Sequence, residues 1–357
     1  MKLQRFVNGI VTISIVFISQ GSIGQVPYER ILNASDEPQN WLTYNGGYMS
    51  QRHSLLEQIN RENVNQLELK WVLQNQVFGA WQSNPIIVDG IMYVTERPNS
   101  VMAVDAVTGR VYWKYRHQNA ENALVCCGAN NRGVAVLNDK VYMGTLDAHL
   151  VALDRVNGQL LWEAEVGDVN LAYSVTMAPL AVKDKILVGV GGGEFGIRGY
   201  VAAFNAETGE QAWKTYTIPG PGEANHDSWE GDDWEHGGAP VWITGSFDSD
   251  LNLTFWGVGN PGPDWNAGQR PGDNLYSDSA IALDADTGEL KWYFQFTPND
   301  AYDYDSVQVP VLADMEWRGE AKKVMMWANR NGYFYVLDRT NGQFLEGKPY
   351  VKVNWSS

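Results

Sequence analysis

The sequence predicts an all-β protein made of β-propeller blades. Five copies of one motif carry this prediction: AVDAVTGRVYW at 103–113, ALDRVNGQLLW at 152–162, AFNAETGEQAW at 203–213, ALDADTGELKW at 282–292, and VLDRTNGQFLE from Val336. Their glycines stand at positions 109, 158, 209, 288 and 342, so successive copies lie 49, 51, 79 and 54 residues apart. Repeats of this period with strand-forming sequence are typical of propeller blades, each made of four antiparallel strands.

Within each copy, the motif predicts a strand, a tight turn at Thr-Gly or Asn-Gly, and a second strand. Glycine supplies the positive φ that such hairpin turns require. The apolar runs PIIVDGIMYVT and KVYMGTL between copies predict the remaining strands of the blades. The composition agrees, because 15 Trp, 17 Tyr and 36 Gly favour many strands joined by turns over a helical protein.

The net charge of −16 and the pI near 4.7 exclude nucleic acid as the expected partner. Phosphate backbones are bound by clusters of Lys and Arg, and this chain has none.

The N-terminus predicts a secretory signal peptide at 1–24. Lys2 and Arg5 precede the apolar run IVTISIVFIS, and the small residues Ser22 and Gly24 flank the expected cleavage region. The run is shorter than the roughly 20 residues that span a bilayer, and no second candidate follows. We therefore expect a periplasmic protein with no transmembrane span, with 25–357 as its mature part. An uncleaved anchor is the alternative.

Cys126 and Cys127 are adjacent and are the only cysteines of the chain. In an oxidising compartment they can form a disulfide, and bonding neighbours closes a tight, strained ring of the kind found at functional sites. The alternative is a reduced, buried pair.

The 79-residue step contains roughly 30 residues more than the other steps, which are near the propeller period of about 50. Most of the excess lies between Pro219 and Gly245, in a segment rich in His, Trp and acidic residues. Loops of this length are usually functional, so we expect a functional insertion; a surface decoration is the alternative.

The repeated motif, the Cys-Cys pair and their neighbouring segments resemble the pyrroloquinoline quinone (PQQ) dependent alcohol dehydrogenases of the methanol and ethanol dehydrogenase type. The likeness runs from Trp41 to Ser357. It implies an eight-bladed propeller with PQQ near its axis, between a vicinal disulfide and a tryptophan. Only about the first five blades are present, so we interpret the chain as a partial propeller, the N-terminal portion of a larger enzyme, and expect it to be inactive alone.

The resemblance also implies site roles. The residues that match PQQ contacts are Gln82, Cys126, Cys127, Arg132, Thr176, Gly191, Gly192, Gly193, Trp242 and Arg330. Those that match metal ligands are Glu194, Asn260, Asp303 and Asp305. Oxygen donors of this kind suit calcium or another hard cation. Asp303 matches the family's catalytic base. Arg330 matches the positively charged side chain that lies beside the quinone oxygen.

Asp305 follows Asp303 by two residues, a spacing that places both carboxylates on one side of an extended segment. In the resembling family an aspartate here marks lanthanide enzymes, so we expect a lanthanide in preference to Ca²⁺. Gln82, where a glutamate is usual, departs from the family pattern.

The function predicted is periplasmic, PQQ-dependent oxidation of small primary alcohols to aldehydes. Electrons are expected to pass to a soluble cytochrome c, since no CxxCH haem motif is present. A homodimer is compatible with the resemblance. The alternatives are a non-catalytic propeller scaffold of the outer-membrane assembly type, a sugar-oxidising quinoprotein, and an inactive fragment.

Overall fold

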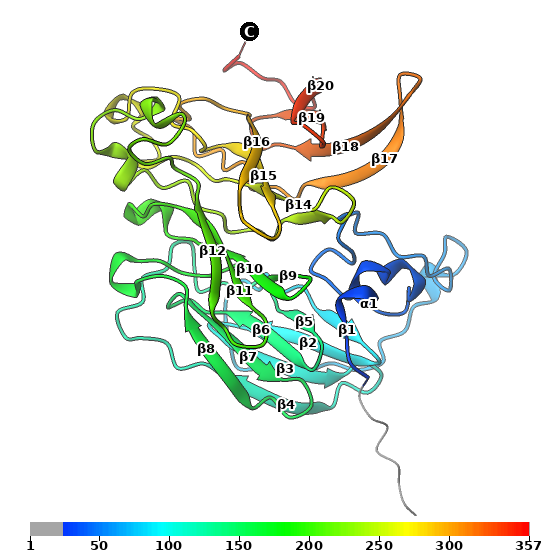
Figure 1. Ribbon diagram of the computed structural model, residues 1–357. Coiled ribbons are helices and arrows are strands. Elements are labelled where there is room, and N and C mark those ends of the chain that lie inside the picture. Colours follow the sequence, from blue (N-terminus) through cyan, green and yellow to red (C-terminus); the bar gives the residue numbers. More distant parts are fainter. Residues whose placement is uncertain (1–23, 357) are drawn as a thin grey trace, which may run out of the picture.

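The structure, a computed structural model, describes residues 24–356, and this part of the chain forms five four-stranded antiparallel sheets (Figure 1). Each sheet is a meander of four consecutive strands, which is the arrangement of a propeller blade. The all-β, propeller-like fold expected from the sequence is thus confirmed. The predicted signal peptide at 1–24 lies outside the described residues except for Gly24.

The first blade comprises β1 (Ile86–Val88), β2 (Ile91–Glu96), β3 (Ser100–Asp105) and β4 (Val111–Arg116), and the second β5 (Ala135–Leu137), β6 (Lys140–Gly144), β7 (His149–Asp154) and β8 (Leu160–Glu165). The third comprises β9 (Leu180–Val182), β10 (Lys185–Gly189), β11 (Tyr200–Asn205) and β12 (Gln211–Tyr216), and the fourth β13 (Ser246–Asp248), β14 (Leu253–Gly257), β15 (Ser279–Asp284) and β16 (Leu290–Gln295). The fifth comprises β17 (Val311–Trp317), β18 (Glu320–Ala328), β19 (Tyr333–Asp338) and β20 (Gln343–Pro349).

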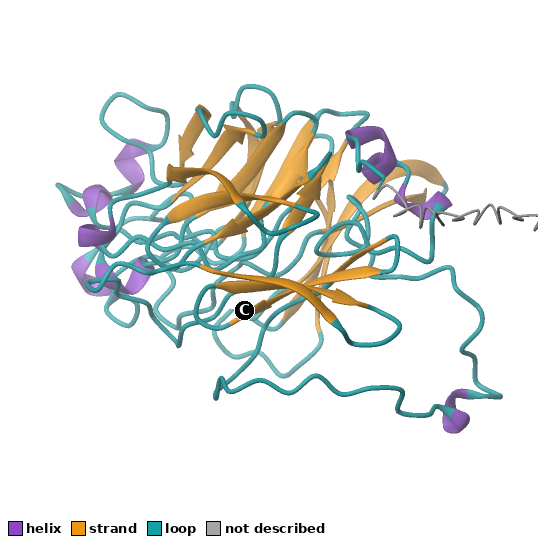
Figure 2. Ribbon diagram, turned by 90° about the horizontal axis from the view of Figure 1, so that it is seen from below, coloured by secondary structure: helices purple, strands orange, loops and turns teal. Residues whose placement is uncertain are grey.

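Helical structure is limited to α1 (Tyr28–Leu32) and single 3-10 turns in the described chain. These turns are η1 (Ala34–Asp36), η2 (Val64–Gln66), η3 (Val169–Leu171), η4 (Gly193–Phe195), η5 (His226–Ser228), η6 (Asp233–Glu235) and η7 (Ala267–Gln269). Figure 2 shows most of the loops and short turns gathered at one end of the strands. None of the described helices is long and apolar enough to cross a membrane.

The repeated sequence motif forms the two outer strands of every blade. It covers β3–β4, β7–β8, β11–β12, β15–β16 and β19–β20. The side chain of Asp105 accepts hydrogen bonds from the backbone N–H groups of Val107 and Thr108, and this Asx-type turn recurs in the other copies. The first strand of each of the first four blades is largely buried, whereas the fourth strands of the first two blades contain only exposed and half-buried residues.

Each motif glycine packs against a tryptophan of the preceding segment. Gly158 lies on the ring of Trp113, and the indole N–H of Trp113 donates to the carbonyl of Arg155 at 3.1 Å. The same contact joins Trp71 to Gly109, Trp162 to Gly209, Trp213 to Gly288 and Trp292 to Gly342. The tryptophan that ends one repeat therefore docks on the turn of the next. Trp71 is a further tryptophan of this kind that the motif search did not find, because it has no TG turn of its own before it.

This docking predicts a large effect for Gly209→Ala. At Gly209 φ is +75°, and a Cβ would lie 2.8 Å from the ring of Trp162. We expect a loss of about 2–4 kcal/mol in the free energy of unfolding of the full-length protein, from left-handed backbone strain and overpacking together. The matched control is Gly222→Ala, where φ is +86° but no atom lies within 4 Å of the added Cβ. Urea unfolding that gives the same loss for both variants would contradict the docking role.

The N-terminal segment packs across the innermost strands. The backbone of Trp41 pairs with Ile87 of β1, and Tyr48 donates its hydroxyl to the carbonyl of Ala181 in β9 at 2.8 Å. The N–H of Phe247 in β13 donates to the carbonyl of Tyr48. This segment therefore contacts several blades at once and ties their inner edges together.

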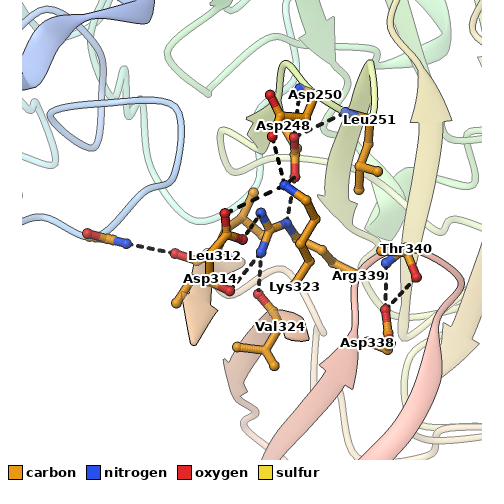
Figure 3. A network of polar contacts seen from close by, with 12 residues as sticks. Asp248, Asp250, Leu251, Leu312, Asp314, Lys323, Val324, Asp338, Arg339 and Thr340 are labelled. Carbon is orange, nitrogen blue, oxygen red and sulfur yellow. Dashed lines mark hydrogen bonds and ion pairs between the residues drawn. The ribbon is translucent and has the colours of Figure 1, made fainter. Parts of the chain in front are cut away.

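Buried ion pairs join the fourth and fifth blades (Figure 3). Arg339, which is 1% exposed, donates from Nε to Oδ2 of Asp248 at 2.7 Å and from Nη1 to the carbonyl of Ala313 at 2.7 Å. Lys323 adds a bond to Asp250 at 2.8 Å. Because a buried guanidinium must find partners, this network fixes the relative position of the two sheets.

Candidate active site

One cavity of about 550 Å³ lies where the loops of all five blades converge. Gln82, Arg132, Thr176, Trp242 and Asp305 each stand shortly before the first strand of a different blade, and all five line it. In an antiparallel meander, the loops that enter the first strand and those that follow the second lie at the same end of the sheet. Glu194 and Arg330 reach the cavity from loops of the latter type, after β10 and β18.

Most of the predicted site residues line this cavity. They are Gln82, Cys126, Cys127, Arg132, Thr176, Gly191, Gly192, Glu194, Trp242, Asp303, Asp305 and Arg330. Two other predicted residues, Gly193 and Asn260, are buried and do not line the cavity. Gly193 is buried against Pro240, and Asn260 is 2% exposed, with its backbone N–H donating to Oδ1 of Asp305 at 3.3 Å. The sequence therefore located the residues, while their roles stay predictions.

Cys126 and Cys127 are joined by a disulfide. Their loop is held by Asn130, which donates to the carbonyl of Cys127 at 3.0 Å, and by Arg97, which donates to the carbonyl of Ala129 at 3.1 Å. A carboxylate oxygen of Glu194 lies within 4.8 Å of both sulfurs. Bonded sulfurs are not thiolates and do not act as metal ligands here, so the pair provides an apolar, polarisable wall.

Arg132 lies between the oxygen atoms of Thr176 and the ring of Trp242. Its Nη1 donates to Oγ1 of Thr176 at 2.8 Å, and its guanidinium carbon lies 4.7 Å from the ring centroid of Trp242. Burial lowers the pKa of this guanidinium from its usual value. A half-buried arginine that makes no ion pair among the described residues presents a positive charge to the cavity, which suits a planar anionic ligand.

Asp303 and Asp305 both have left-handed backbone, with φ of 59° and 50°. The extended geometry assumed for this spacing is therefore wrong; both side chains still line the cavity because the loop is bent around Asp300, whose carboxylate accepts from the N–H groups of Tyr302 and Tyr304. Left-handed non-glycine residues are concentrated at functional sites.

The electrostatics of these two carboxyls differ from those of surface aspartates. Burial raises the pKa of Asp303 to about 6, opposed by the nearby charge of Arg330. Burial also raises the pKa of Asp305 to about 7; this carboxyl accepts from the indole N–H of Trp242 at 3.0 Å and pairs with Nη1 of Arg330 at 3.1 Å. The pKa of Glu194 is raised as well, first by burial and then by the charge of Asp264.

Asp264 is a site residue that the sequence did not indicate. Its Oδ1 accepts from the side-chain amide of Asn260 at 2.8 Å, and its charge raises the pKa of both Asp303 and Glu194. Because the amide nitrogen is engaged by this bond, we expect the side-chain oxygen of Asn260 to be the atom that faces a cation. The only sequence signal is its place four residues after Asn260 in GNPGPDW.

Asp264→Ala is accordingly predicted to weaken metal binding by about 10–100-fold in the full-length protein, as loss of an outer-shell partner does. Asp264→Asn keeps an acceptor for the amide of Asn260 and should lose much less. Titration of the stripped protein with Ca²⁺ or La³⁺ measures both. An Asn variant as weak as the Ala variant would show that charge, and not amide orientation, is what matters.

Three other cavity residues, two of which the sequence did not indicate, stand at the same spacing in their loops. Asn130, Ser174 and Pro240 line the cavity two residues before Arg132, Thr176 and Trp242, just as Asp303 does before Asp305. The spacing of two residues within each of these four loops is the sequence signal that could have found them. Tyr44, Val125, Gly128 and Ile243 complete the lining, and nothing in the repeat pattern marks them.

The long insertion contributes to the cavity only near its end. Pro240, Trp242 and Ile243 line the cavity. Trp229 is buried in the hydrophobic core and donates its indole N–H to the carbonyl of Leu275 at 2.5 Å. The acidic side chains from 230 to 235 lie toward the surface. Most of the insertion therefore does not line the cavity, which favours the alternative of a surface decoration.

The donor set fits a quinone cofactor and a hard cation. Gly191 and Gly192 bring backbone to the cavity lining, and Gly192 also packs closely on its own fold, because a Cβ there would lie 2.4 Å from the carbonyl oxygen of Ala172. Arg132 and Thr176 offer hydrogen-bond donors, Trp242 offers a flat ring, and Glu194, Asp303 and Asp305 offer hard oxygen ligands.

A comparison with protein-family models decides the family. Residues 41–353 match the model described as "Glucose/ethanol/alcohol dehydrogenase, beta-propeller domain", named PQQ. The chain belongs to this family of PQQ propellers.

Relatives with curated names and solved structures agree. The quinoprotein alcohol dehydrogenase PedH of Pseudomonas putida is 40% identical over 97% of this chain and 61% of its own length. The quinohemoprotein alcohol dehydrogenase ADHIIG of Pseudomonas putida HK5 superposes with a TM-score of 0.88 at 41% identity, over 93% of this chain and 51% of that one. A europium-containing methanol dehydrogenase superposes with a TM-score of 0.87 at 38% identity, over 92% and 61%.

The chain thus spans about half to three fifths of the length of these relatives. The PQQ-type propeller family is shared across nearly all of this chain.

Proposed function

We propose that the full-length protein oxidises primary alcohols to aldehydes with PQQ as its redox cofactor. The observation that carries this proposal is the convergence of Arg132, Thr176, Trp242 and the bonded cysteines on one cavity with three carboxylates. The relatives named above are alcohol and methanol dehydrogenases, which supports the same reaction class.

Four features of this chain would hold PQQ. Arg132 would bind a cofactor carboxylate, because a guanidinium pairs with carboxylates through two parallel hydrogen bonds. Thr176 would donate its hydroxyl, while Trp242 and the disulfide would form apolar walls. When bound, PQQ supplies the two-electron acceptor for the hydride that leaves the alcohol carbon.

Asp303 is the residue that would remove the hydroxyl proton of the alcohol. Its pKa of about 6 places it among carboxyls tuned toward neutrality, which is where a general base works best. Arg330, whose guanidinium opposes that rise, would stabilise negative charge that develops beside it.

Glu194, Asn260, Asp303 and Asp305 would hold the cation. Three carboxylates and an amide oxygen supply more negative charge than a divalent ion needs, so we propose a lanthanide in preference to Ca²⁺. The europium-containing methanol dehydrogenase among the structural neighbours supports a trivalent ion in a site of this family.

The periplasm is the proposed location, from the signal sequence at 1–24, and a soluble c-type cytochrome is the proposed electron acceptor. The quinohemoprotein relative supports haem-based electron transfer within this group of proteins.

The test adds PQQ with La³⁺ or Ca²⁺ to the metal-stripped full-length protein and measures dye-linked oxidation of methanol, ethanol and glucose. The proposal expects alcohol-dependent dye reduction that requires PQQ and is faster with La³⁺. Turnover of glucose alone would favour a sugar-oxidising quinoprotein. Absence of activity with either ion would favour a scaffold.

A further inference from the structure

We propose a second, transition-metal site between the outer strands of the first and second blades, formed by His117, His149 and Glu163. One ring nitrogen of each histidine and one carboxylate oxygen of Glu163 all lie within 4.8 Å of one another. This cluster uses residues of β7 and β8 and the residue that follows β4, whereas the cavity described above is lined by other loops.

The ligand chemistry differs from that of the cavity. Two imidazoles and one carboxylate suit Zn²⁺, Ni²⁺, Co²⁺ or Cu²⁺, whereas Ca²⁺ and lanthanides select oxygen ligands. The carboxyl groups of Asp147 and Glu163 lie beside the two imidazoles and add acidic groups that favour a cation. The oxygen donors of the cavity therefore suit a hard cation, whereas the imidazole nitrogens of this cluster suit a transition metal.

Asp147 supplies the outer-shell support that metal-binding histidines usually have. Its carboxylate contacts Nε2 of His117 at 2.9 and 3.0 Å and lies 3.7 Å from Nδ1 of His149. The carboxylate is fixed in turn by the hydroxyl of Thr145 at 2.7 Å and the N–H of Ala120 at 2.9 Å. The imidazole of His117 is thereby oriented by a rigid carboxylate, which also lies beside the ring of His149.

His149 has the features of a ligand. Its Nδ1 is buried and makes no hydrogen bond, while its Nε2 lies 3.9 Å from Oε1 of Glu163. Ligand atoms around a tetrahedral ion with bonds near 2 Å stand about 3.3 Å apart, so a small closure of the Glu163 side chain would complete this edge. The side chains of His149 and Glu163 are partly exposed, which gives an ion access.

The site would have a structural consequence for the loop that carries the vicinal disulfide. This cysteine loop (117–134) begins at His117, directly after β4, and leads to Cys126 and Cys127. A cation shared by His117, His149 and Glu163 would clamp the start of the loop to the second blade.

The experiment titrates Co²⁺ into untagged full-length protein whose oxygen-ligand site has first been saturated with Ca²⁺, and follows the visible absorption bands of bound cobalt. We expect one equivalent of Co²⁺, displaced by Zn²⁺. His149→Ala should abolish the signal, and Asp147→Asn should weaken binding by about 10–100-fold. The matched control is His53→Ala, an exposed histidine far along the chain from the cluster, which should bind as the wild type does.

Glu163→Gln serves as a second variant because it replaces a partly exposed side chain with one of the same size, and its fold can be checked by circular dichroism. It should also lower Co²⁺ affinity, and Zn²⁺ should raise the thermal unfolding midpoint of the wild type more than that of this variant. A wild type that binds no Co²⁺, or binding that survives both His149→Ala and Glu163→Gln, would overturn the proposal.

Discussion

Asp303→Asn is expected to reduce kcat for alcohol oxidation by about 10²–10⁴-fold in the full-length protein loaded with PQQ and metal, because it removes the only proposed proton acceptor. Asparagine has nearly the same size and keeps an oxygen toward the cation. Dye-linked turnover under saturating alcohol measures the effect.

Asp232→Asn is the matched control for this substitution, since Asp232 is an exposed carboxylate of the insertion and does not line the cavity. PQQ and metal content must be measured in both variants. If Asp303→Asn retains full PQQ and metal and loses less than tenfold in kcat, another group removes the proton and the assignment is wrong.

Asp305→Ala is expected to change which ion supports activity. The carboxylate of Asp305 is 7% exposed and lies between the indole of Trp242 and the guanidinium of Arg330. Its removal takes one negative charge from the ligand set, so La³⁺ should bind at least roughly 10–100-fold more weakly, as losing even an outer-shell partner costs that much. Activity with Ca²⁺ should fall less than activity with La³⁺.

Competition titrations of La³⁺ against Ca²⁺, in wild type and Asp305→Ala, give this shift directly. Asp250→Ala provides a control, because it removes an exposed carboxylate that pairs with Lys323, and neither residue lines the cavity. An unchanged La³⁺ to Ca²⁺ affinity ratio in Asp305→Ala would remove the basis for lanthanide preference.

The repeat motif was enough to predict the blades because its pattern is local. The Asx turn, the left-handed glycine and the terminal aromatic all lie within eleven residues, and each has a direct structural cause. The motif alone did not indicate which tryptophan packs on its glycine. The ring that covers Gly109 comes from Trp71, in a segment with no motif of its own.

The cavity was predicted through family resemblance, and its residues come from loops that are far apart in the sequence. Gln82 and Arg330 meet at one cavity only because successive meanders place equivalent loops at the same end of each sheet. The spacing of residues along the chain did not predict the site where the backbone departs from an extended conformation. The left-handed conformations of Asp303 and Asp305 depend on hydrogen bonds to Asp300, which no spacing rule indicates.

Asp264 and the cluster at His117 show the same limit in another form. Asp264 acts through the amide of Asn260, and Asp147 through two imidazoles from different blades. Such outer-shell contacts cannot be recognised as a sequence motif. They require only that an acceptor lie within hydrogen-bonding distance of a donor, and the fold determines that distance.

The central claim is that this cavity holds PQQ through Arg132, and equilibrium binding of PQQ tests it most directly. Full-length protein with metal present should bind one equivalent of PQQ. Arg132→Met should weaken that binding by about 1.5–3 kcal/mol, or roughly 10–150-fold, through loss of a charged hydrogen-bond donor. The control Arg318→Met removes an exposed arginine that stacks on Trp317, and since neither residue lines the cavity, this variant should bind as the wild type does. A wild type that binds no PQQ, or an Arg132→Met variant with unchanged affinity, would contradict the account.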